Sequence, residues 1–111
     1  MIDYKDLRQF IGSESYVNVM GVNVTDGCQY LMENGVSWLI TDIISVKIAS
    51  KLRKEEFLSC KLNVTNSKAV LTITDGNDKT LYTQKYEYTD LNDGIIKLFL
   101  TDNVLMLSSE Y

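Results

Sequence analysis

The sequence contains no histidine and no proline, and its only cysteines are Cys28 and Cys60. Histidine is the usual general base near neutral pH and the commonest metal ligand, so the residue that most often fills either role is absent. Two cysteines far apart cannot complete a structural zinc site, and without a secretion signal they are expected to be free thiols in a reducing cytoplasm. We therefore expect no metal and no cofactor.

Long apolar runs and glycine-rich loops are also missing. Residues 1–6 do not resemble a signal peptide, and no segment approaches the roughly 20 apolar residues of a membrane-spanning helix. The six glycines are scattered singly, so there is no phosphate-binding loop. We expect a cytoplasmic protein that makes no contact with a membrane.

Positive charge is scarce, because 15 Asp and Glu residues stand against 11 Lys and Arg residues, a formal net charge of −4. Contacts with phosphate come largely from Lys and Arg, so direct nucleic-acid binding is not expected. The sequence has one local basic cluster: Lys47, Lys51, Arg53 and Lys54. This cluster is interpreted as the solvated end of a helix, with nucleic-acid binding as the less favoured alternative.

What is present is typical of one globular domain covering residues 1–111, with 45% apolar and 23% charged residues. Helical spacing predicts a short amphipathic helix over Asp3–Ile11. A second helix is expected to start at Thr25 or Asp26 and to close at Asn34-Gly35. A third is expected from Trp38 to about Ser50, with Ser37 as N-cap. It is apolar over most of its girth, which is typical of a buried helix, although its β-branched residues leave a strand conceivable for part of it.

From Glu55 onward the apolar residues recur with a period of two, which indicates strands. The expected strands cover residues 57–65, 69–74, 80–88, 95–100 and 104–107, with turns at residues 75–78 and 101–103. Residues 16–24 are expected to be extended, as an edge strand. Helices followed by strands indicate an α+β fold, here two or three N-terminal helices packed on a four- to five-stranded antiparallel meander sheet.

No catalytic arrangement emerges from the remaining residues. Cys60 is expected to face inward as an inert apolar side chain, and Cys28 lies near a possible helix N-terminus that could lower its pKa. Neither has a histidine partner, and none of the 15 acids is singled out by spacing as half of an acid–base pair. Acid pairs such as Asp75 and Asp78 lack the further ligands of a calcium loop and are better explained by turn chemistry.

Several polar and aromatic residues nevertheless attract attention as binding groups. Asp42 interrupts an apolar helix and is either exposed or, if buried, paired with a Lys or Tyr side chain. Three tyrosines on one strand face, at positions 82, 86 and 88, suit either core lining or contact with a partner. Tyr111 is expected to dock onto the domain or onto a partner.

Four segments occur in a fixed order along almost the whole chain: residues 25–31 (TDGCQYL), 38–43 (WLITDI), 88–91 (YTDL) and 104–111 (VLMLSSEY). This order resembles a small uncharacterised family of bacterial and mobile-element proteins that is known by a domain-of-unknown-function label. The family pattern has a Thr-Asp-Gly helix start, a Trp-Leu-x-x-Asp helix, a Tyr-Thr-Asp step and a Leu-Pro-Ser-Glu-Tyr ending. The chain departs from it at Ser108, where the pattern has proline.

The resemblance implies a protein of Bacteroidetes-type genomes and their phages and plasmids, with no assigned catalytic activity. Small acidic proteins of such elements are often inhibitors of host defence, so we expect a non-enzymatic anti-CRISPR protein. Its partner would be an RNA-guided effector nuclease, with an RNA-cleaving (type VI) effector preferred, or the guide-RNA complex of that effector. The residues expected to bind this partner are exposed acids and one aromatic anchor: Asp26, Asp42, Asp90, Glu110 and Tyr111. The alternative is a structural or regulatory module that forms a homodimer through a free sheet edge or through the tyrosine face.

Overall fold

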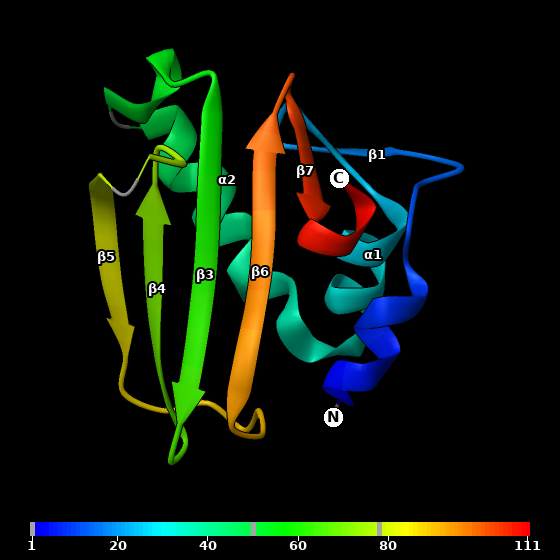
Figure 1. Cartoon of the computed structure of the whole chain (residues 1–111), viewed down its shortest axis with the longest axis vertical. Coiled ribbons are helices and arrows are strands. Elements are labelled where there is room, and N and C mark those ends of the chain that lie inside the picture. Colours follow the sequence, from blue (N-terminus) through cyan, green and yellow to red (C-terminus); the bar gives the residue numbers. More distant parts are fainter. Residues whose placement is uncertain (1, 50, 78) are drawn as a thin grey trace.

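The computed structural model describes residues 2–49, 51–77 and 79–111. Ser50, Asp78 and the side chain of Lys51, which enter the predictions above, lie outside the described residues. The seven strands of the described chain form one sheet in the order β1-β2-β7-β6-β3-β4-β5 (Figure 1). Their bounds are β1 Val17–Val19, β2 Val22–Val24, β3 Phe57–Thr65, β4 Lys68–Thr74, β5 Thr80–Tyr86, β6 Gly94–Thr101 and β7 Val104–Leu107.

One long helix, α2, lies behind the sheet and leaves the front of β5, β4, β3 and β6 without a helix (Figure 1). It covers Ser37–Ala49 and is preceded by a short helix, α1, over Asp26–Leu31. A π-type segment, η2 (Met32–Val36), joins the two, and three 3-10 turns complete the helical structure: η1 Tyr4–Gln9, η3 Lys51–Lys54 and η4 Ser108–Glu110. The kink between α1 and α2 occurs at Gly35, whose φ of 86° is a left-handed conformation that glycine adopts without steric cost.

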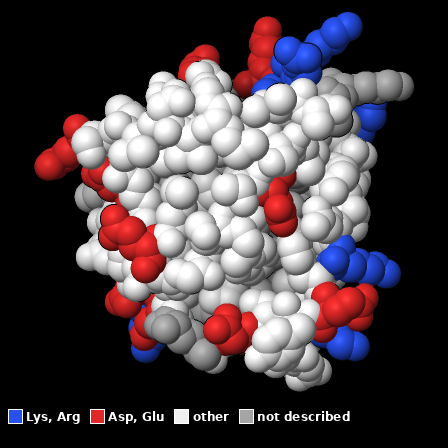
Figure 2. Space-filling model, turned by 180° about the vertical axis from the view of Figure 1, so that it is seen from behind, with Lys and Arg blue, Asp and Glu red and all other residues white. Residues whose placement is uncertain are grey.

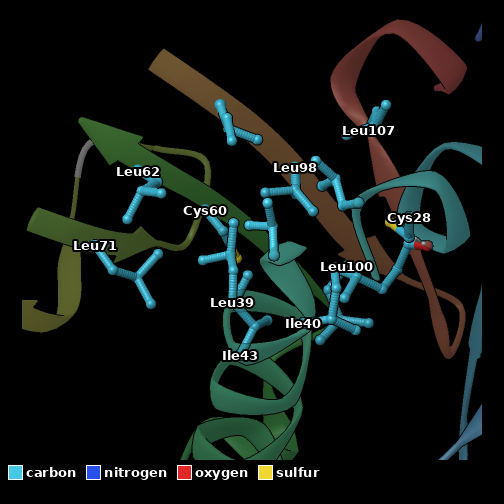
Figure 3. Packing of buried hydrophobic residues seen from close by; sticks show 14 of the residues in the cluster. Cys28, Leu39, Ile40, Ile43, Cys60, Leu62, Leu71, Leu98, Leu100 and Leu107 are labelled. Atoms are coloured by element: carbon cyan, nitrogen blue, oxygen red, sulfur yellow. Dashed lines mark hydrogen bonds between the residues drawn. The ribbon is translucent and has the colours of Figure 1, made fainter. Parts of the chain in front are cut away.

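The core lies between α2 and the back of the sheet. Leu39, Ile40, Ile43 and Ile44 of α2 are fully buried. Figure 3 shows Leu39, Ile40 and Ile43 among the inward side chains of the strands. Those inward residues alternate along each strand: Leu58, Cys60, Leu62 and Val64 on β3, Leu71 and Ile73 on β4, and Ile96, Leu98 and Leu100 on β6. Burying one such side chain contributes about 1.5–3 kcal/mol, which is why the period-two pattern fixes the face of each strand.

Three hairpins turn through two residues with positive φ. The turn residues are Met20-Gly21, Asn66-Ser67 and Asp102-Asn103, with φ between 51° and 91°. Positive φ at both central residues gives the turn whose twist matches that of the flanking strands. The fourth hairpin, between β4 and β5, is held by Asp75, whose carboxylate accepts hydrogen bonds from the backbone N–H groups of Asn77 and Lys79.

The structure confirms a mixed α+β fold and corrects its details. The expected four to five antiparallel strands are wrong, because the sheet has seven strands and β2 pairs parallel with β7, at Asn23–Val104 and Val24–Leu105. The expected edge strand over residues 16–24 is instead a hairpin of two three-residue strands, which are too short to show a period. The expected N-terminal helix is the 3-10 turn η1, and β5 ends at Tyr86 rather than at Tyr88. The third helix is confirmed as a helix, so the strand alternative is excluded.

Candidate protein-binding surface

The residues singled out by the sequence gather in two places. Asp26 and Glu110 lie where α1 begins, beside the C-terminal turn η4, and Tyr111 follows that turn. Asp90 lines an open hollow of about 440 Å³ near the start of α2, and Asp42 adjoins it through its hydrogen bond with Tyr86. We call this the aromatic hollow, and it is lined by Gly35, Trp38, Tyr86, Tyr88, Thr89 and Asp90.

Glu110 ties the end of the described chain to the start of α1. Its carboxylate accepts hydrogen bonds from the hydroxyl of Thr25 (2.6 Å), from the backbone N–H of Gly27 (3.0 Å) and from the backbone N–H of Leu107 (2.9 Å). Thr25 is the N-cap of α1 but makes no side-chain cap bond of its own, so Glu110 satisfies the free N–H of the first turn. A Cβ at Gly27 would lie 2.5 Å from both Glu110 Oε1 and Leu107 Cδ1, so a larger residue there would displace these two side chains.

Asp26 is engaged by the loop that precedes the first hairpin. Its carboxylate accepts hydrogen bonds from the backbone N–H of Glu14 and the hydroxyl of Ser15, both at 3.0 Å. These donors stabilise the ionised form and hold the pKa of Asp26 below its usual value. Asp26 and Glu110 are half-buried, so the prediction that they are exposed is wrong. Both carboxylates already accept hydrogen bonds from other residues of the chain.

Asp42 connects α2 to β5. The hydroxyl of Tyr86 donates a hydrogen bond of 2.7 Å to its carboxylate, and the Tyr86 ring lies 4.8 Å from that of Trp38. Asp42 is half-buried rather than exposed, and of the two alternatives the paired one, with a tyrosine partner, is correct. Burial and the neighbouring carboxylate raise the pKa of Tyr86, so its hydroxyl stays protonated and keeps donating.

Tyr88 and Asp90 form the accessible rim of the aromatic hollow. Tyr88 is 74% exposed and lies just beyond the end of β5, and Asp90 is exposed as predicted. Thr89, between them, is buried; its N–H donates to the carbonyl of Ser67 at 2.8 Å and its hydroxyl accepts from the N–H of Leu91. This buried residue fixes the backbone, so Tyr88 and Asp90 project from an ordered segment. Of the three tyrosines expected on one face, Tyr82 and Tyr86 are half-buried and line the sheet, and Tyr88 alone is exposed.

Tyr111 docks onto the front of the sheet. Its ring packs edge-on against Phe99 at 5.1 Å and Phe57 at 5.9 Å, although the residue stays 74% exposed. The turn before it, η4, forms with serine at position 108, where the resembling family has proline. Its last N–H, that of Tyr111, donates to the carbonyl of Ser108 at 3.4 Å.

The two thiols do not behave as nucleophiles. Both are fully buried, and burial raises the pKa of Cys28 and of Cys60 to about 12. The idea that the start of α1 lowers the pKa of Cys28 is therefore wrong, because desolvation outweighs it; the thiol instead donates to the carbonyl of Leu105. Within residues 2–49, 51–77 and 79–111, no three Cys, Asp or Glu side chains come close enough to hold a metal ion.

The basic cluster at positions 47–54 is partly structural. The ammonium of Lys47 donates to the carbonyls of Leu52 (2.7 Å), Arg53 (3.4 Å) and Glu55 (2.5 Å), which closes the chain between α2 and β3. Burial lowers the pKa of Lys47. Arg53 and Lys54 are exposed, as a solvated helix end requires.

Together the fold and these sites define a two-layer α+β domain with an open aromatic hollow. The chain belongs to a family of unknown function, DUF6876, which it matches over residues 2–111. No curated protein and no solved structure matches the chain. Among the helices that the structure describes, none is long and apolar enough to cross a membrane.

Two features of the surface are not predicted from the sequence. The first is that Trp38, which the apolar pattern places in a buried helix, also lines the aromatic hollow. Four lysines on the front of the sheet were not connected with one another, because they lie on four different strands. The period-two pattern of β3 was the available signal, since it puts Lys61 on the face opposite to Cys60 and Leu62.

Proposed function

We propose that this protein works by binding another protein, and that the aromatic hollow is its docking surface. The observation that carries this proposal is the exposure of Tyr88, 74%, beside the half-buried ring of Trp38 and the exposed carboxylate of Asp90. Tyr and Trp are enriched among the residues that dominate binding energy, because they offer a large rigid surface at low entropic cost. The hydrogen bond from Tyr86 to Asp42 holds the floor of the hollow in place before a partner arrives.

The partner that we propose is a bacterial defence nuclease, and more narrowly an RNA-guided CRISPR effector of the RNA-cleaving (type VI) class, free or with its guide RNA. The protein would then be an anti-CRISPR inhibitor of a phage or mobile element, acting in the cytoplasm of the host bacterium without catalysis. The channels of such effectors are basic, and a carboxylate-bearing surface complements them. Asp and Glu stand out on the helix side of the molecule, where Lys and Arg lie only at the rim of the view (Figure 2).

The five predicted contact residues are not equivalent in this proposal. Asp90 and Tyr111 are accessible and can meet a partner directly. Asp26, Asp42 and Glu110 already accept hydrogen bonds inside the chain. They would attract a basic partner through their negative charge more than through direct contacts. Charge reversal at Asp90 should therefore weaken binding while the fold persists.

Affinity capture tests the proposal. The tagged protein is expressed in a bacterium that carries several CRISPR systems, and the bound proteins are identified by mass spectrometry. We expect one effector in stoichiometric amount with the unmodified protein, and at least a tenfold lower recovery with the double variant Tyr88→Ala, Asp90→Lys.

The matched control is Tyr16→Ala, Glu56→Lys. It changes another exposed tyrosine and an exposed acid, neither of which lines the hollow. Recovery should stay as in the unmodified protein. Equal loss in both variants would reject the hollow as the docking surface, and recovery of no effector at all would reject the inhibitor function.

The alternative, a self-associating module, has one observation in its favour. β5 is the last strand of the sheet, so its outer edge is not paired within the described chain. A free edge of seven residues can pair with the same strand of a second copy.

A further inference from the structure

We infer that the open front of the sheet, opposite α2, binds single-stranded nucleic acid. We call this surface the open face. It is formed by the outward side chains of β5, β4, β3 and β6, in front of which Figure 1 shows no helix. The inference concerns a surface other than the aromatic hollow and a partner other than a protein. Tyr111 is the one residue named in both proposals, and it lies outside the lining of the hollow.

The first observation is the sign of the charges on the open face. The register of the sheet assigns four charged side chains to outward positions of these strands, and all four are lysines: Lys61, Lys68, Lys85 and Lys97. All four are exposed. No Asp or Glu occupies an outward position of the four strands, although acids outnumber bases in the whole chain. The outward charges within these four strands are therefore all positive, with the exposed acids Glu56 and Glu87 adjoining the ends of β3 and β5.

The second observation is that two of these lysines face each other. Lys61 on β3 and Lys97 on β6 are direct cross-strand partners in an antiparallel pair. Their Cβ atoms are therefore about 5 Å apart, and like charges at that spacing destabilise a sheet. Lys85 lies two strands away from Lys61, about 10 Å across the sheet. A row of phosphates would relieve the repulsion between Lys61 and Lys97 and would also reach Lys85.

The third observation is an aromatic cluster at one end of the same face. Phe57, Phe99 and Tyr111 pack together, with ring centroids 5.1 to 5.9 Å apart, and Tyr111 is 74% exposed. The ammonium of Lys97 lies 5.6 Å from the centre of the Phe99 ring, so positive charge and aromatic surface adjoin. Aromatic rings stack on unpaired bases whatever their sequence, and lysines hold the backbone. A duplex offers no free base that could stack on these rings.

The net charge of −4 does not oppose this binding. The shortest dimension of the molecule is 24 Å, and it runs roughly from the open face to the helix side (Figure 1). The screening length is about 10 Å at 0.1 M salt, so carboxylates on the far side act weakly at the open face.

Fluorescence anisotropy with the purified protein tests the inference. The probes are labelled 12-nucleotide RNA and DNA strands of mixed sequence, each titrated between 50 and 300 mM salt, and the two arms show whether the 2′-hydroxyl matters. We expect saturable binding. A plot of the logarithm of the association constant against the logarithm of the salt concentration should have a slope of about −3, because each of the four lysines releases counterions from the strand. Tyr111→Ala should lower the affinity about tenfold without changing the slope, because stacking involves no counterion.

The decisive comparison uses two double variants with the same change in net charge. Lys61→Glu, Lys97→Glu alters the open face and keeps a like-charged cross-strand pair, so its effect on folding should be small, as circular dichroism can verify. Lys5→Glu, Lys54→Glu alters two exposed lysines outside that face. We expect at least a tenfold loss of affinity and a slope shallower by about 1.4 for the first variant alone. Absence of binding by the unmodified protein at 50 mM salt, or equal losses in both variants, would overturn the inference.

Discussion

At the scale of single residues, the segments singled out near the start of α1 and at residues 104–111 have chiefly structural roles in this chain. The Thr-Asp-Gly segment and the Glu-Tyr ending lie about 85 positions apart in the chain, yet Glu110 accepts hydrogen bonds from Thr25 and Gly27. Three donors use the carboxylate of Glu110 as their acceptor, and a side chain at Gly27 would meet the side chains of Glu110 and Leu107. The sequence suggested that these residues belong to a helix start, but it could not reveal that the partner of the helix start is at the far end of the chain.

We predict that Glu110→Ala lowers the free energy of unfolding by about 2 kcal/mol, because it leaves the 3% exposed Thr25 hydroxyl and two N–H groups without their acceptor. Glu110→Gln should lower the free energy of unfolding by less, because the amide oxygen can still accept a hydrogen bond although the NH₂ group cannot. Urea unfolding at neutral pH measures both, with Glu56→Ala as a surface control that should stay within about 0.5 kcal/mol. A midpoint for Glu110→Ala equal to that of the control would contradict the assigned role.

At the scale of elements, the patterns with local causes were predictable from the sequence. The period of two located β3 at residues 57–65, and the turn residues at positions 75–77 and 102–103 were recognised by their chemistry. The pairing of β2 with β7 was not predictable, because it joins segments about 80 residues apart and each strand contributes only two paired residues. The helix α2 was predictable from its long apolar segment, but the expected burial over most of its girth is wrong. Only Leu39, Ile40, Ile43 and Ile44 are buried, and Ile48 is 41% exposed.

The turn between β3 and β4 offers a stabilising change. Asn66 and Ser67 have φ values of 51° and 63°, and serine in this left-handed conformation is strained by about 1 kcal/mol relative to glycine. We predict that Ser67→Gly raises the free energy of unfolding by about 0.5–1 kcal/mol, since its carbonyl can still accept the bond from Thr89. Thermal and urea unfolding measure the gain.

The turn between β6 and β7 supplies the comparison for that prediction. Asn103, with a φ of 59°, is in the same conformation, but its side-chain amide donates to the carbonyl of Gly21 at 2.9 Å. Asn103→Gly should therefore gain little or lose stability, because relief of strain is offset by the lost hydrogen bond. A loss of stability for Ser67→Gly would show that its backbone is not strained.

At the scale of the whole molecule, the two sides of the sheet have separate characters. The helix side buries the core and carries scattered carboxylates (Figure 2), whereas the front carries lysines and an aromatic cluster. Composition hid this division, because the net charge averages the two sides. The order of strands was needed to reveal that Lys61, Lys68, Lys85 and Lys97 share one face.

The same strand order predicts how stability is distributed, and it tests whether a second copy covers the sheet edge. β3 has a neighbour on each side, so amides of Cys60 and Leu62 should exchange with solvent only by global unfolding. β5 has a neighbour on one side only, and alternate N–H groups along it point away from β4. We expect those amides to exchange fast and at the same rate in dilute and in concentrated protein, as hydrogen exchange followed by NMR measures. If the protection of these alternating amides instead grows with protein concentration, β5 pairs with β5 of a second molecule. The homodimer would then be the better hypothesis than a binding protein that acts as a monomer.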